Sequence, residues 1–372
     1  MKKNTKKFIG IALICIIITV LFSTGLNQQQ PIEDLDAISG LGADLVIKNG
    51  EVEHIVPMSV YLFEHEGKIE SILRTGIAQT IGQTRQNRQL ADDKQNLLGL
   101  EKVLIISEQQ ALYGLKNWID ILFRNPYSND TEYVAVCKGK ASDILGMNLK
   151  GYPSSADFIE GLIRNSVFYN FFSNDYKIMD LFSSVDSEGC NVVLPYIEVL
   201  NNEIKITGMA LFDKDKMVSK IGIDELRIMN IMRENNVNGI LTIQKSPQTY
   251  VDYYAKSKRK VSCIKKGDKY KFIIDINLEG DLIQNTIYKD LENHPEKNEQ
   301  FNKEMSEEIT DKCNDFIIKM KNECKVDCLQ LGMVAAAKYG RQSGNDWNKI
   351  ICNSEIKVNV NVKINKLGRR NY

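Results

Sequence analysis

The sequence predicts an α+β protein of mixed α/β composition, in which an N-terminal membrane signal or anchor precedes two or three sheet-and-helix domains. Three observations lead to this prediction. A basic and then apolar segment opens the chain, strand and helix patterns alternate through residues 43–172, and long strand patterns with a long helical pattern fill the C-terminal half. The 372 residues suffice for two domains, which we expect to meet near residues 201–202.

Residues 1–26 have the pattern of an export signal. Four lysines within the first seven residues precede an apolar run from residue 8 to residue 22, which only Thr19 interrupts. As a helix that continues to Leu26, this segment would be about 28 Å long, close to the ~30 Å hydrocarbon core of a bilayer. It could remain as a single anchor or be cleaved after Gly25, and an alternative start or lipidation is a third option. In each case we expect the rest of the chain to lie outside the cytoplasmic membrane.

The charge balance bears on the choice of partner. The chain carries 48 basic and 48 acidic side chains, so no overall positive field would attract nucleic acid. Hydrophobic residues make up 43% and charged residues 26%, which is typical of a folded chain and excludes disorder as a description of the whole protein. We therefore expect a folded protein that binds no nucleic acid.

The eight cysteines do not form a metal-binding or disulfide pattern. One lies in the signal, which leaves an odd number spread over the rest of the chain. Cys324 and Cys328 have three residues between them, with no second pair and no histidine nearby, so a zinc site is not expected. Cys313 and Cys324 would be about 16 Å apart on one helix, too far for a disulfide. Buried thiols are the favoured interpretation, and we predict no metal and no cofactor.

A polar linker at residues 27–31 leads into the first domain, residues 32–201. Residues 43–76 have the pattern of three consecutive strands. Asn49–Gly50 predicts the turn between the first two strands, and Glu66–Gly67 predicts the turn before the third. The domain therefore starts with an antiparallel meander.

Strand and helix patterns then alternate. Residues 77–92 are polar and compatible with a helix. Residues 103–106 form a continuous apolar strand pattern, and Ser107 would cap a helix whose apolar residues recur up to residue 122. A second apolar strand and a short helix follow within residues 132–145. This order predicts a βαβ unit with a parallel pair of strands.

The segments around the expected domain boundary are less regular. Residues 154–172 have the periodicity of a second amphipathic helix, and residues 192–199 form an apolar strand pattern that Pro195 breaks. Two strands joined at residues 213–216 come next, and a helix is expected from about Ile223.

The second domain, residues 202–372, has longer elements. A β-hairpin is predicted to turn at Gly267–Asp268, and residues 289–340 predict one long helix followed by a second. The long helix has an apolar stripe formed by Ile309, Cys313, Phe316, Ile317 and Met320. Residues 356–364 alternate strictly between apolar and polar side chains, which predicts a half-buried strand with one wet face.

Few side chains are arranged for catalysis. Gly40 and Gly42 in "SGLGAD" lack the third glycine of a dinucleotide site, so we interpret them as a bend at the start of a strand. His54, His65 and His294 are scattered, without the i, i+4 pair of a helical metal site. The acidic runs near the long helix are interpreted as its solvated face. We predict no catalytic, cofactor-binding or metal-binding residues.

The strongest basic cluster is "AKSKRK", residues 255–260. Such a cluster could contact the phosphates of a membrane surface. On a long hairpin it more often keeps an exposed edge soluble, and this is the favoured interpretation.

Several motifs, in this order and spacing, resemble the Ger(x)C family of spore germination proteins. They are "IEDLDAISGLGAD", "LEKVLIISEQQALYGLKNWIDILFRNP", "YVAVCKGKASDIL", "ITGMALFDKDKMVSKIGIDE" and "KVDCLQLGMVAAAKYG" with the following "DWNKI" and "IKVNVNVKINKLG". The resemblance covers essentially all of the chain after the signal. It implies a C subunit of a nutrient germinant receptor, built from two or three α/β parts on the outer face of the spore inner membrane.

The resemblance also implies partners and a lipid. Members work with integral-membrane A and B subunits as receptors for nutrients, and no catalytic residues are carried over from them. They are typically lipoproteins whose modified cysteine opens the mature chain. Leu26 stands at that position here, after Gly25, so the resemblance predicts no lipidation site in this chain. A retained signal helix would supply the same tether.

These observations lead to one main hypothesis and one alternative. The main hypothesis is a non-enzymatic, membrane-tethered C subunit that docks with A and B subunits and helps nutrient binding to trigger spore germination. The alternative is an exported solute-binding protein for a small nutrient, which requires a cleft between two lobes and affinity for the nutrient by itself. An envelope hydrolase would need a catalytic constellation that the sequence does not contain.

Overall fold

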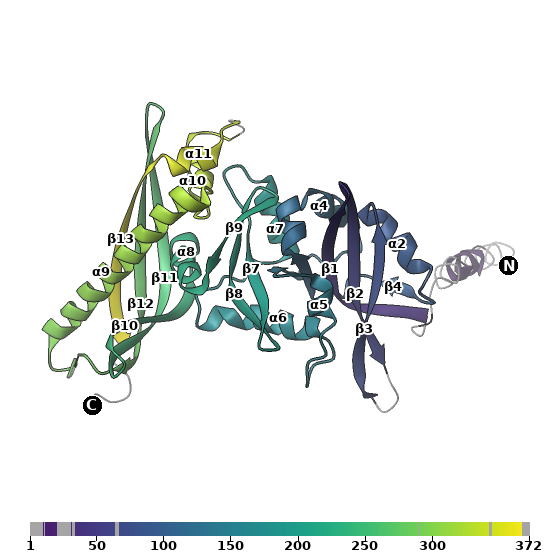
Figure 1. The fold of residues 1–372 in the computed structure, drawn as a ribbon, viewed down its shortest axis with the longest axis horizontal. Helices are drawn as coiled ribbons and strands as arrows, with labels where there is room; N and C mark the ends of the chain where they lie inside the picture. Colours follow the sequence, from purple (N-terminus) through teal and green to yellow (C-terminus); the bar gives the residue numbers. More distant parts are fainter. Residues whose placement is uncertain are drawn as a thin grey trace, which may run out of the picture.

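The computed structural model describes residues 10, 12–20, 31, 34–63, 67–288, 290–341 and 344–366. Figure 1 shows an elongated molecule in which two sheets follow one another along the long axis, with the N-terminal half on the right. The two sheets with their helices confirm the predicted mixed α+β class.

The predicted export signal lies mostly outside the described residues, and so do Leu26 and the turn residue Glu66. Residues 12–20 are helical and exposed. Within the described part of the chain, no helix combines the length and the apolar character that a membrane span requires.

The first sheet has nine strands in the order β3-β2-β1-β5-β6-β7-β8-β9, and β4 (Gln95–Leu97) pairs with β1. The other strands are β1 (Leu35–Lys48), β2 (Glu51–Phe63), β3 (Ile69–Ala78), β5 (Val103–Ser107), β6 (Tyr133–Cys137), β7 (Val193–Leu200), β8 (Glu203–Asp213) and β9 (Lys216–Gly222). The four central strands β1, β5, β6 and β7 are parallel to one another, and the β5–β6 pair confirms the predicted parallel pair. Antiparallel strands extend the sheet at both ends.

Helices cover both faces of this sheet. On one face, the core contains residues from α2 (Ile81–Gln89), α3 (Glu108–Tyr113), α4 (Lys116–Phe123) and α7 (Ile178–Asp186). On the other face lie α5 (Ala141–Leu145) and α6 (Ser155–Asn165). Because β5 is covered on both sides, all five of its residues are buried, as its unbroken apolar pattern predicts.

Several predicted elements need correction. The cap at Ser107 is confirmed, since its Oγ accepts a hydrogen bond from the Gln110 N–H at 3.2 Å. The single helix expected after it is wrong, because Gly114 adopts φ 127° and divides the segment into α3 and α4. The helix expected over residues 154–172 ends at Asn165, and Phe171 beyond it has φ 57°.

Two further expectations around the first sheet were wrong. The segment "SGLGAD" lies inside β1 and is not a bend at its start. Pro195 does not break its strand, since β7 runs through it and Pro195 opposes Met209 of β8. Helix α7 was not predicted, and it fills the irregular segment before β7.

The second sheet has four strands in the order β10-β11-β12-β13. They are β10 (Val237–Ser246), β11 (Thr249–Lys266), β12 (Lys269–Asn285) and β13 (Glu355–Lys366). The hairpin at Gly267–Asp268 is confirmed, and β13 pairs in parallel with β12. The alternating pattern of β13 is confirmed as well, with Val358 and Val362 buried.

The predicted long helix is α9 (Pro295–Lys319), which continues into a π-helical turn, η4 (Met320–Cys324). The five residues of its predicted apolar stripe are all buried. Two shorter helices, α10 (Leu331–Tyr339) and α11 (Trp347–Cys352), connect it to β13. Figure 1 shows α9 lying along the second sheet, where it packs against β13.

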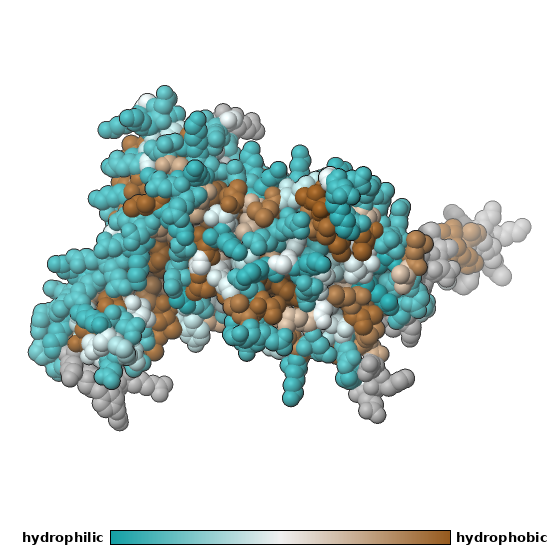
Figure 2. Space-filling view, viewed as in Figure 1, coloured by the Kyte–Doolittle hydropathy of each residue, from teal (hydrophilic) through white to brown (hydrophobic). Residues whose placement is uncertain are grey.

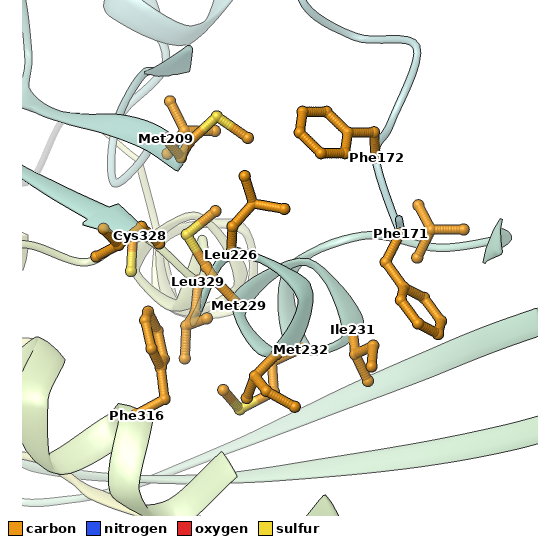
Figure 3. Packing of buried hydrophobic residues seen from close by; sticks show 14 of the residues in the cluster. Phe171, Phe172, Met209, Leu226, Met229, Ile231, Met232, Phe316, Cys328 and Leu329 are labelled. Atoms are coloured by element: carbon orange, nitrogen blue, oxygen red, sulfur yellow. The ribbon is translucent and has the colours of Figure 1, made fainter. Parts of the chain in front are cut away.

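The two sheets share one continuous core. A single cluster of buried residues extends from Val103 in β5 to Val362 in β13. Helix α8 (Ile223–Arg233) lies between the sheets, and Figure 3 shows its side chains between Met209 of β8 and Phe316 of α9. The expected boundary at residues 201–202 lies at the β7–β8 turn, and β8 and β9 extend the first sheet to Gly222. The division into domains at that point stays a prediction.

Candidate functional site

The carboxyl ends of parallel strands are the first place to look for a site, because ligands of α/β sheets commonly bind there. Asp44 from "SGLGAD" lies at this edge. Its carboxylate accepts hydrogen bonds from the N–H groups of Ala141 at 2.6 Å and Ser142 at 3.0 Å. Both groups belong to the first turn of α5, so Asp44 caps that helix from a strand 97 residues away in sequence. Its role at this edge is structural.

A polar network lies across the same part of the sheet. The Tyr196 hydroxyl donates to Glu108 Oε2 at 2.9 Å, and Lys220 Nζ donates to Glu108 Oε1 at 3.2 Å and to the Tyr196 oxygen at 3.0 Å. Burial and the hydrogen bond to Glu108 raise the pKa of Tyr196, so its phenol stays neutral. Each charged group here already has a partner of opposite charge, and none is positioned as a free acid or base.

The three histidines are not brought together. His54 is buried in β2, and burial lowers the pKa of its imidazole. His294 is exposed at the start of α9, with Nδ1 at 2.8 Å from Glu296 Oε1. His65 lies outside the described residues. Among the residues that the structure describes, no group of three potential metal ligands occurs.

One residue of the basic cluster at residues 255–260 has a different role from the one expected. Arg259 does not keep an exposed edge soluble, because its Nη1 donates to the Met232 carbonyl and to the Leu329 carbonyl at 2.9 Å. Burial lowers the pKa of its guanidinium to about 10. Lys256, Lys258 and Lys260 remain exposed on the same strand.

The cysteines are free thiols in the described chain, and six of them are buried. Burial raises the pKa of the Cys313 thiol to about 12, and it raises that of Cys137 as well. A buried thiol with a raised pKa is a poor nucleophile. This agrees with the expected packing role of these residues.

The motif "KVDCLQLG" connects the two halves of the molecule. Asn191 Nδ2, just before β7, donates to the Asp327 carbonyl at 3.0 Å and to Asn348 Oδ1 at 2.7 Å. The Asp327 carboxylate accepts from the N–H groups of Leu329 at 3.0 Å and Gly332 at 2.7 Å. Residues far apart in sequence are thereby held by a buried polar network.

Arg233, the last residue of α8, completes this network. Its Nη1 donates to the Cys328 carbonyl at 2.9 Å, and its Nη2 donates to the Asn191 carbonyl at 3.3 Å. Its Nε lies 2.8 Å from Glu234 Oε1, and only 4% of its side chain is exposed. We call this network of Asn191, Arg233, Asp327 and Asn348 the junction network. It fixes the relative placement of the two sheets.

One apolar surface in the N-terminal half is not covered. Phe123 at the end of α4 is 72% exposed, and its ring meets that of Phe182 edge-on at a centroid distance of 5.6 Å. Met179 is 45% exposed and lies three residues before Phe182, on the same side of α7. We call the exposed Phe123 and Met179, together with the buried Phe182 that Phe123 contacts, the α4–α7 patch. Figure 2 shows hydrophobic surface over the part of the molecule that α4 occupies in Figure 1.

Little in the sequence predicted this patch. Phe123 belongs to a predicted helix, but its exposure depends on where α4 ends and how α7 packs beside it. Met179 and Phe182 lie in the segment for which no helix was predicted. An amphipathic spacing of Ile178, Leu181 and Phe182 was the signal available for that helix.

Comparison with known proteins covers both halves of the chain. Residues 28–199 match the family described as spore germination protein N-terminal domain. Residues 207–368 match the family described as spore germination B3/GerAC like, C-terminal.

Curated relatives and a solved structure agree with these matches. Spore germination protein GerQC of Bacillus cereus is 22% identical over 364 residues, which cover 95% of this chain and 98% of that protein. Spore germination protein A3 of Bacillus subtilis (strain 168) is 20% identical over 279 residues, 73% of this chain and 74% of that protein. The crystal structure of the GerBC protein has a similar fold, with a TM-score of 0.56, 14% identity, and coverage of 88% of this chain and 97% of that chain.

Proposed function

Because this chain belongs to the Ger(x)C family, the C subunits of spore germinant receptors, we propose that it is a non-enzymatic subunit that docks on integral-membrane A and B partners. In this proposal, the docked complex lies at the spore inner membrane and turns nutrient binding into germination. The observation that carries the proposal is the match of both halves of the chain to this family, in the order and spacing expected from the motifs.

The α4–α7 patch supports a docking role. Aromatic residues and methionine are enriched at protein interfaces, and Phe123 and Met179 are exposed residues of these types. The patch lies in the half of the molecule that follows the N-terminal apolar segment, so a partner embedded in the same membrane would be within reach (Figure 1). Phe123 would be the central contact.

The N-terminal segment is the proposed tether. Its apolar run and flanking lysines fit a retained anchor, with the bulk of the chain on the outer side of the membrane. Mass spectrometry of the N-terminal peptide from the membrane fraction of dormant spores tests this. A peptide that retains residues 1–26 supports the anchor. A start near residue 26 or 27, with the protein in the soluble fraction, would contradict it.

Docking is tested by Phe123→Asp in the chromosomal copy. A central aromatic contact contributes about 2 kcal/mol or more, so recovery of A and B subunits with the tagged chain should fall more than tenfold. The matched control is Ile318→Asp on α9, where the side chain is 58% exposed and remote from the patch in sequence. Equal recovery of the partners with both variants would contradict docking through this patch.

The alternative of an exported solute-binding protein is less well supported. Such proteins close two lobes around the solute by a hinge motion. Here one buried core extends through both sheets, and the junction network ties them together, so relative motion of two lobes is not expected.

A further inference from the structure

A groove opens where α6 meets β8 and α8. Its volume is about 590 Å³, large enough for a small organic molecule. Six of its lining residues form an apolar wall: Tyr152, Phe158, Leu162, Phe172, Ile206 and Ile223. Two rings of this wall, Tyr152 and Phe158, meet edge-on at a centroid distance of 5.2 Å. Figure 2 shows hydrophobic surface over α6, at the lower centre of the view.

The polar end of the groove is positively charged. Arg227 of α8 and Lys205 of β8 line it, and none of the described residues that line it carries a carboxylate. Arg227 Nη2 is fixed by a hydrogen bond to Asn170 Oδ1 at 2.7 Å. This bond orients the guanidinium without neutralising it, because the amide of Asn170 has no charge.

The acidic partners of the two cations lie outside the lining. Arg227 Nη1 is 3.3 Å from Asp224 Oδ1, and the Asp224 side chain is 96% exposed. Lys205 Nζ is 2.7 Å from Glu203 Oε2, and that side chain is 66% exposed. Surface ion pairs of this kind contribute little to stability, so another anion can readily replace the carboxylate in such a pair. A ligand carboxylate could therefore replace Asp224 at Nη1.

The geometry points to a binding site for a small monocarboxylate with an apolar body, held by Arg227 at one end and by the apolar wall at the other. An α-amino acid fits less well, because no carboxylate in the lining would pair with its ammonium group. A neutral alcohol of the same shape would lose the charged contact with Arg227. This inference does not depend on the proposed function, since it concerns binding by the isolated chain.

The test is a calorimetric titration of the full chain in detergent with sodium 3-phenylpropionate. Two comparison ligands, 3-phenylpropan-1-ol and phenylalanine, share its phenyl and propyl frame. Loss of the hydrogen-bonded charge pair should weaken binding of the alcohol at least about tenfold in Kd, and the unpaired ammonium group should weaken binding of phenylalanine by a similar factor. Saturable binding of the carboxylate alone is the expected result.

Variants then locate the site. Arg227→Leu should weaken binding of 3-phenylpropionate at least about tenfold, whereas Asp224→Asn should strengthen it, because the competing carboxylate is removed. Leu162→Trp should abolish binding by filling the groove while leaving Arg227 in place. Arg164→Leu is the control for loss of one positive charge from the same region, since its partner Glu160 and its own side chain lie outside the lining.

Urea unfolding of each variant, measured beside the wild type, separates lost binding from lost folding. The opposite signs expected for Arg227→Leu and Asp224→Asn cannot both arise from misfolding. Absence of saturable binding at millimolar 3-phenylpropionate would overturn the inference. Binding that Arg227→Leu and Leu162→Trp leave unchanged would also overturn it, because it would then occur in the detergent or elsewhere on the chain.

Discussion

Arg233 is expected to be among the most sensitive positions for stability, and Arg233→Ala tests this. The substitution removes the donor to two carbonyl groups, those of Cys328 and Asn191, at 2.9 and 3.3 Å. It also leaves Glu234, which is 14% exposed, without its cation at 2.8 Å. Breaking a buried charge pair in this way costs about 3–5 kcal/mol of unfolding free energy.

The matched control is Arg124→Ala. Arg124 makes an ion pair of similar length, 2.9 Å, with Asp120, but the two side chains are 77% and 62% exposed. The expected loss there is about 0–1 kcal/mol. A third variant, Arg233→Lys, keeps the charge but not the planar set of guanidinium donors. It should therefore lose less unfolding free energy than Arg233→Ala and more than Arg124→Ala.

Urea unfolding of the full chain provides the measurement. The chain has two tryptophans, and the structure places Trp118 in the core of the first sheet and Trp347 beside the second. Single-tryptophan versions would therefore report on each half separately. Because Arg233 joins the halves, Arg233→Ala should lower both urea midpoints, by about 1 M for a loss of 3 kcal/mol if m is about 3 kcal/mol/M. If Arg233→Ala lowered the free energy of unfolding no more than Arg124→Ala does, the junction network would not hold the two halves together.

Two further predictions concern stability. Gly189→Ala should destabilise the protein far more than Gly151→Ala. Both glycines have positive φ, 73° for Gly189 and 89° for Gly151. A Cβ at position 189 would lie 2.3 Å from the backbone carbonyl carbon of Gly332, whereas a Cβ at position 151 would lie in open space. Equal urea midpoints for the two variants would contradict that close approach. Burial raises the pKa of the Glu132 carboxyl well above 4.5 in the folded chain. Above about pH 4.5 this carboxyl is therefore ionised in the unfolded chain while it is still neutral in the folded chain. Stability should fall as the pH rises through this range. Glu132→Gln should therefore gain more stability at pH 8 than at pH 5, and an equal gain at both pH values would refute the assignment.

Local patterns predicted the secondary structure where one interaction dominated. The unbroken apolar run of β5 requires burial on both faces, the alternation in β13 requires one wet face, and Asn49–Gly50 and Gly267–Asp268 allow tight turns. The predictions failed where the tertiary environment outweighed periodicity. The segment after Asn165 has helical spacing, but it continues only as a 3-10 turn over Ser166–Phe168 before the isolated bridge between Asn170 and Gly239.

The motifs identified the family but not the work that their residues do. In "SGLGAD" the aspartate caps a helix 97 residues away, and in "KVDCLQLG" the aspartate and the neighbouring carbonyls complete the junction network. The groups that these two aspartates contact could not be predicted from the sequence, because each contact depends on how the sheets are placed. The same holds for Arg259, which lies among exposed lysines in sequence and donates to buried carbonyls in space.

The sequence by itself determined the class of fold, much of the order of the elements, the apolar N-terminal segment and the family, since these depend on composition, periodicity and the order of motifs along the chain. Only the tertiary structure decided which polar residues join the two sheets, that Phe123 of α4 and Met179 of α7 stay uncovered, and which cations meet an apolar wall beside α6. The physical reason is that exposure and charge pairing belong to surfaces assembled from distant segments. A residue acquires them only when the packing of one continuous core places its neighbours.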